Sequence, residues 1–94
     1  MTIIEAPKLL GSREEAEELV AQLPADLVGH VIKVSFGATR SVRPSYIDEL
    51  IRQILVERTA DRLILQDVPE GAEETIRRSA VYRRLIDRVE VTSK

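Results

Sequence analysis

The spacing of apolar positions along the chain alternates between the period of a β-strand and that of an α-helix. Four short runs rich in aliphatic and β-branched residues predict strands at 2–5, 30–36, 62–67 and 89–92. Between these runs, apolar residues recur at i, i+3 and i+4, as on one face of a helix. This spacing predicts three helices, at 12–23, at 45–55 and from about 70 toward 85 with a break near Ser79.

Polar residues at the expected helix ends support these boundaries. Ser12 and Glu15 have the spacing of a capping box, and Pro24 ends the first helix. Ser45 is expected to cap the second helix, with Asp48 at the corresponding capping-box position. The second helix has the broadest apolar stripe of the three.

The order βαβαβαβ predicts an α/β fold, because strands joined through helices form largely parallel sheets. We expect a single layered domain over residues 1–94, with a mostly parallel or mixed sheet of about four strands and helices on at least one side. A chain of 94 residues leaves no room for a second domain. Binding surfaces of such sheets gather at the carboxyl ends of the strands, which directs attention to the polar loop 37–45.

Composition narrows the range of functions. Aromatic residues make up only 3% of the chain, so the stacking platforms that bind single-stranded nucleic acids are not expected. A formal net charge of −2 gives no general attraction to phosphate backbones or to anionic membranes. Cysteine is absent, and no segment is predicted to be a signal peptide or a membrane span. A cytoplasmic protein without membrane contact is therefore expected.

Residues 31–55, VIKVSFGATRSVRPSYIDELIRQIL, resemble the central strand, loop and helix of STAS domains, the fold of anti-sigma-factor antagonists. The segments RLILQDVP and IRRSAVYRRLIDRVEV are similar to the strand, helix and last strand that follow, and the closest likeness is to STAS-like variants of unassigned function. In the antagonists, a partner kinase phosphorylates a serine at the start of the helix. Ser45 occupies that position, whereas Arg43, Pro44 and Tyr46 replace the neighbouring residues of the family motif.

The resemblance implies a non-enzymatic regulatory module that binds another protein, either a kinase-like or an anti-sigma-like partner. The expected partner-binding residues lie in the loop and on the following helix: Gly37, Thr39, Arg40, Arg43, Ser45, Tyr46 and Glu49. Phosphorylation of Ser45 would place about two negative charges in this surface and repel the partner. The simpler interpretation is that Ser45 only caps the helix.

Five arginines near the carboxyl terminus form the one marked charge cluster: Arg77, Arg78, Arg83, Arg84 and Arg88. They suggest an acidic partner, the acidic first helix of a second copy in a homodimer, or a nucleic acid, although glutamates at 70, 73 and 74 are placed to balance them. A nucleic-acid accessory protein and a small nucleotide-binding domain are the alternative functions. Catalytic residues, cofactors and metal ligands are not expected, because His30 and Asp67 lack recognisable partners in the sequence.

Overall fold

The structure, a computed structural model, describes residues 2–7 and 9–93. Four parallel strands form the main sheet: β1 (Thr2–Glu5), β3 (Val31–Ser35), β5 (Arg62–Val68) and β6 (Val89–Ser93). Three helices connect them in turn: α1 (Arg13–Val20), α2 (Pro44–Ile51) and α3 (Ala72–Tyr82). The predicted α/β class and the predicted alternation of strands and helices are both confirmed.

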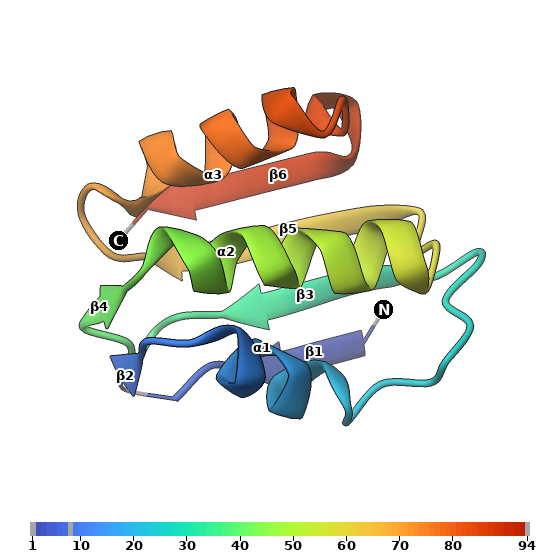
Figure 1. Cartoon of the computed structure of the whole chain (residues 1–94), viewed down its shortest axis with the longest axis horizontal. Coiled ribbons are helices and arrows are strands. Elements are labelled where there is room, and N and C mark those ends of the chain that lie inside the picture. The colour runs from blue at the N-terminus through green and yellow to red at the C-terminus, as the bar shows by residue number, and fades with distance from the viewer. Residues whose placement is uncertain (1, 8, 94) are drawn as a thin grey trace.

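The strands lie side by side in the order β1-β3-β5-β6, so each connection moves one place in the same direction across the sheet. Connections between parallel strands are almost always right-handed, and such a series therefore puts every helix on the same face. Figure 1 shows α1, α2 and α3 together in front of the sheet. The fold has two layers.

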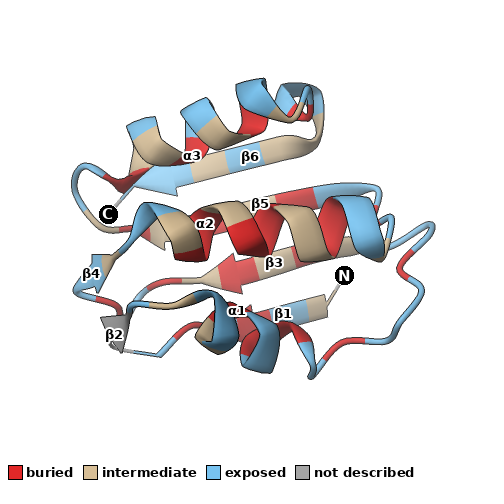
Figure 2. Cartoon of the chain, viewed as in Figure 1, coloured by how far each residue is buried: buried red, intermediate tan, exposed pale blue. Residues whose placement is uncertain are grey.

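The core fills the space between these two layers. Alternate residues of the central strands point under the helices, and Ile32, Val34, Leu63 and Leu65 are buried (Figure 2). The predicted apolar stripe of the second helix packs in the same core as these strand residues. All of its members are buried: Ile47, Leu50, Ile51, Ile54 and Leu55. The opposite face of the sheet carries polar and apolar side chains that no helix covers.

The start of α1 agrees with the sequence, whereas its end and the start of α2 do not. Helix α1 ends at Val20 instead of the predicted position 23, because the amides of Gln22 and Leu23 donate to the carbonyls three residues before them and form turns in place of a further helical turn. At α1, the Glu15 amide donates to Ser12 Oγ at 3.2 Å, which confirms the predicted cap. At α2, Arg43 is the N-cap residue, Pro44 is the first helical residue and Ser45 is the second. The predicted Ser45 cap is therefore wrong. Proline has no N–H and a fixed φ near −65°, so it suits the first helical position, and the helix starts one residue early.

The sequence did not predict four local features. Leu9–Leu10 (β2) and Ser41–Val42 (β4) form a separate parallel pair, so the loop 37–45 contains a short strand. A π-helical segment, η1 (Arg52–Glu57), continues α2, and a 3₁₀ turn, η2 (Ile86–Arg88), precedes β6. Helix α3 runs unbroken through Ser79 and ends at Tyr82, which corrects both the predicted break and the predicted end.

Candidate functional site

A groove of about 460 Å³ lies between the first half of α2 and the outer side of α3. Its lining comes from both helices: Pro44, Asp48, Thr75, Arg78, Ser79 and Tyr82. The last two residues of the loop 37–45 are the first two of α2, and one of them, Pro44, lines the groove. The groove therefore adjoins the region in which the sequence predicted a binding surface. The two neighbouring helices that form it are shown in Figure 1.

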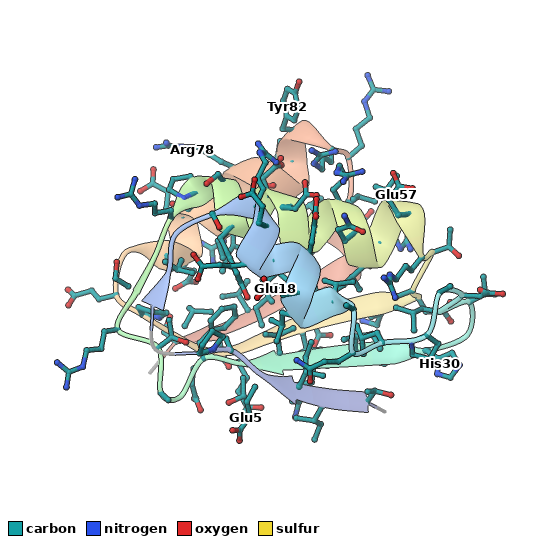
Figure 3. The ribbon with its side chains drawn as sticks, turned by 60° about the horizontal axis from the view of Figure 1, so that its bottom comes forward. Glu5, Glu18, His30, Glu57, Arg78 and Tyr82 are labelled. Atoms are coloured by element: carbon teal, nitrogen blue, oxygen red, sulfur yellow. The ribbon has the colours of Figure 1, made fainter. Side chains whose placement is uncertain are left out.

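The most exposed large side chain of the groove is Tyr82. Of the three aromatic residues in the chain, Phe36 and Tyr46 are fully buried, whereas Tyr82 is 83% exposed. Figure 3 shows its ring on the side of α3 away from the sheet. The adjacent Val81 is 61% exposed, so α3 presents two apolar side chains to solvent at its end.

Helical spacing explains why Tyr82 is outside. Ala72, Ile76 and Ala80 recur every four residues and are buried against the sheet. Positions 74, 78 and 82 recur with the same spacing on another side of the helix, and all three are exposed. Folding therefore does not bury the Tyr82 ring.

Asp48 lies in the wall of the groove and ties α2 to α3. Its Oδ1 accepts hydrogen bonds from Ser79 Oγ and from Arg83 Nε, both at 2.8 Å, and Arg83 Nη2 donates to Oδ2, also at 2.8 Å. These bonds from Arg83 lower the pKa of Asp48 from 3.8 to about 2, which outweighs the opposing effect of burial. The carboxylate is therefore ionised at neutral pH, and both of its oxygens accept hydrogen bonds. The predicted role of Asp48 in a capping box is wrong.

Glu49, the next residue, holds a second set of charges between α1 and α2. Its side chain is only 4% exposed, and Arg52 binds it through two hydrogen bonds of 3.0 and 2.6 Å. Gln53 Nε2 and Arg13 Nη1 each donate a further bond at 3.1 Å. Hydrogen bonds from Arg52 lower the pKa of Glu49 from 4.5 to about 2. Glu49 is a structural anion, which removes it from the predicted partner-binding surface.

Two further residues of the predicted surface are also inside the protein. Thr39 is fully buried, and its Oγ1 donates to the Pro7 carbonyl at 2.7 Å, which fastens the loop to the segment after β1. Tyr46 is fully buried on the inner side of α2, and its hydroxyl has no hydrogen-bond partner among the residues that the structure describes. Burial, together with the nearby charge of Glu15, raises the pKa of this hydroxyl.

The rest of the predicted surface is accessible. Gly37, Arg40 and Arg43 are exposed at the carboxyl edge of the sheet, and Ser45 is half-buried in the first turn of α2. Neither arginine forms an ion pair with any residue in the described part of the chain. The structure thus brings a shorter set of predicted residues to the surface, beside a groove that the sequence did not reveal.

The predicted arginine cluster does not form one basic patch. Arg77 and Arg78 pair with Glu73 and Glu74 at 2.8 and 2.7 Å, one helical turn away. Arg83 forms a salt bridge with Asp48, and Arg88 donates hydrogen bonds to the main-chain carbonyls of residues 55, 60 and 61. Only Arg84 is both exposed and unpaired within residues 2–7 and 9–93. The balanced arrangement of arginines and glutamates explains this region better than a phosphate-binding surface does.

The remaining polar candidates do not converge. His30 is exposed in the turn before β3, and Asp67, with φ +57°, lies at the end of β5, where its amide donates to Thr92 Oγ1. Within the described residues, no three acidic or histidine side chains are grouped as metal ligands. In the same part of the chain, none of the helices has the length and apolar character needed to cross a bilayer.

Sequence reasoning missed Tyr82 and the contact between Asp48 and Arg83. The position of Tyr82 relative to Ile76 and Ala80 on a helix could have predicted that its side chain points to solvent. No sequence pattern could have predicted the contact between Asp48 and Arg83, because the two residues are 35 positions apart. Comparisons with protein-family models, with curated proteins and with solved structures give no match for this chain. The resemblance to STAS domains therefore stays a prediction.

Proposed function

We propose that this chain is a non-enzymatic, regulatory protein-interaction module, and that the groove between α2 and α3 is its contact surface. The observation that carries the proposal is the exposure of Tyr82 beside a groove that lies next to the loop 37–45. Tyrosine is enriched among the residues that contribute most to protein interfaces, because it brings a large apolar area and few rotatable bonds. The resemblance to STAS domains points in the same direction.

The chemistry of the groove also favours binding over catalysis. A general acid or base works best with a pKa near the working pH, whereas the pKa of Asp48 is about 2 and its two oxygens are occupied by Arg83 and Ser79. The neighbouring Glu49 is held in the same way by Arg52. Both carboxylates position helices: Asp48 holds α3 against α2, and Glu49 holds α1 against α2.

The proposal is tested by affinity capture from the native host with three tagged versions of the chain. We expect the wild type to retain a specific protein that Tyr82→Ala loses. Val56→Ala is the matched control, because Val56 is also an exposed apolar side chain but lies on η1, outside the residues that line the groove. Quantitative mass spectrometry compares the three samples. Identical protein profiles for all three versions, or no specifically retained protein, would refute the proposal.

A further inference from the structure

The groove between α2 and α3 has different side chains at its two ends. The helices run in the same direction, as Figure 1 shows, and Ser79 on α3 donates a hydrogen bond of 2.8 Å to Asp48 on α2. Pro44 and Thr75 each lie four residues before this pair, so they form one end of the groove. Tyr82 follows Thr75 by seven residues, about 10.5 Å along the helix, and stands at the other end. One end therefore holds a protruding ring, and the other end holds smaller side chains.

This arrangement is self-complementary. A two-fold axis through the middle of the groove exchanges its two ends when a second copy is brought against it. Tyr82 of each copy then lies over Pro44 and Thr75 of the other. Because positions 75 and 82 exchange about the midpoint between 78 and 79, Arg78 faces Ser79 of the other copy. The two Arg78 side chains therefore do not meet on the axis.

The charges of the groove also suit contact with an identical surface. Two identical surfaces repel each other where they carry unpaired charge of one sign. In the groove walls, Arg83 neutralises Asp48 at 2.8 Å, and Glu74 neutralises Arg78 at 2.7 Å. Contact between two such surfaces therefore leaves burial of the exposed Tyr82 ring as the main favourable contribution.

Helix α1 offers a less favourable surface to a second copy. Its glutamates form no ion pair with any residue that the structure describes: Glu14, Glu15, Glu17 and Glu18. Two copies would repel each other there. Arg77 and Arg78 of a second copy do not supply the missing charge, because each already pairs with a glutamate of its own helix. Contact between α1 and the arginine cluster is therefore less favourable than contact through the groove.

From this geometry, and resting on the proposed function above, we infer that the groove binds a second copy of this chain, in a two-fold dimer in which each Tyr82 occupies the groove of the other copy. Each ring buries about 150 to 250 Å² and covers a similar area of groove, so the contact buries about 600 to 1,000 Å² in total. Stable complexes bury about 1,200 to 2,000 Å². The dimer is therefore weak, with a Kd between about 10 μM and 1 mM.

The inference is tested by sedimentation equilibrium of the full chain at concentrations from about 5 μM to about 2 mM, which bracket this range. We expect the average mass of the wild type to rise with concentration toward twice the monomer mass. Tyr82→Ala removes the ring, and Thr75→Arg fills the end of the groove that receives it. Each substitution should weaken association by about tenfold or more. Tyr82→Phe keeps the ring and should associate like the wild type.

A mixture of the two defective variants is the most specific test. In a heterodimer, the Tyr82 ring of the Thr75→Arg copy meets the unaltered groove of the Tyr82→Ala copy. One of the two contacts is then intact, whereas neither variant can form an intact contact with itself. The equimolar mixture should therefore associate about threefold more tightly than either variant alone, since half of the lost binding free energy is restored.

Val28→Ala is the matched control, because Val28 is 64% exposed but lies in the turn before β3, outside the residues that line the groove. It should associate like the wild type. Urea unfolding of each variant at low protein concentration checks that the fold is intact.

The outcomes separate the inference from the proposed function. A wild type that stays monomeric throughout, a dimer that Tyr82→Ala leaves unchanged, or a mixture no stronger than its components would overturn the inference. Capture from the host then decides the proposed function, because a different protein that only the Tyr82→Ala version loses would keep the groove as a contact surface. Capture that retains no such protein, together with a monomeric wild type, would overturn both.

Discussion

Glu49→Gln is the substitution that best tests the energetics of the helix layer. Glutamine keeps the shape of the side chain and removes its charge, so Arg13 and Arg52 lose an anion that is almost completely buried. The pKa of Glu49 falls from 4.5 to about 2 on folding. At about 1.4 kcal/mol per pKa unit, the ionised form contributes roughly 3 kcal/mol of stability at pH 7. We expect Glu49→Gln to lower the free energy of unfolding by about 2 to 3 kcal/mol at that pH, because Arg52 keeps Glu57 as a second partner.

The pH dependence of this effect follows from the sign of the shift. A carboxylate with a lowered pKa stabilises the folded state above its unfolded pKa, and the contribution disappears as the pH falls toward the folded value. The gap between the wild type and Glu49→Gln should therefore shrink between about pH 5 and pH 2, with about half of it gone at pH 3.

Urea unfolding followed by far-ultraviolet circular dichroism measures the gap, since the chain has no tryptophan. Glu57→Gln is the control, because Glu57 binds the same Arg52 at 2.7 Å but its side chain is 55% exposed. This substitution should lower the free energy of unfolding by less than about 1 kcal/mol. Equal losses for the two variants, or a gap for Glu49→Gln that does not change with pH, would refute this reasoning.

Three further outcomes are expected. Tyr82→Ala should unfold within about 0.5 kcal/mol of the wild type in urea, because its ring is exposed, and a larger loss would show that the ring is part of the core. Gly71→Ala should lower the free energy of unfolding by about 1 kcal/mol, because Gly71 has φ +88°, which alanine adopts only with strain. Gly37→Ala should leave it unchanged, because the added Cβ would meet Ser35 Oγ at an ordinary 3.6 Å, and equal losses for the two variants would contradict this reasoning. A short DNA or RNA duplex at about 50 mM salt should not bind measurably in a fluorescence titration, and binding that weakens steeply with salt would restore the nucleic-acid alternative.

The sequence allowed the fold to be predicted because local signals were consistent with one another. The alternation of β-branched runs with helical stripes fixed the order of strands and helices, and the stripe from Ile47 to Leu55 is buried as expected. The capping box at Ser12 was correct for the same reason, because it depends on residues three apart. The predicted start of α2 was wrong because two neighbouring residues both favour a helix start. Ser45 could cap a helix with its hydroxyl, whereas the fixed φ of Pro44 suits the first helical position, and the structure has Pro44 there.

The site was predicted only in part, because its contacts are distant in sequence. Asp48 was interpreted through its own helix, and Arg83 through its neighbouring arginines, yet the two form a pair across α2 and α3. Thr39 was assigned to a surface loop, although its hydroxyl bonds to the carbonyl of Pro7, 32 residues away. No periodicity or spacing encodes such pairs, since they arise only when the parallel strands bring separate helices, or the segments that follow neighbouring strands, together.

The position of Asp48 has a consequence for how the groove should be studied. Its bonds to Ser79 and Arg83 fix α3 against α2, and the same carboxylate lines the groove between them. A variant such as Asp48→Asn would therefore alter the packing of the two helices and the proposed binding surface together, and weaker capture of a partner would not show which of the two changes caused it. Tyr82 lines the same groove but is almost fully exposed, so its removal changes the surface without removing a contact that holds the helices. Substitution of Tyr82 therefore tests the proposed binding role without a large change in the free energy of unfolding.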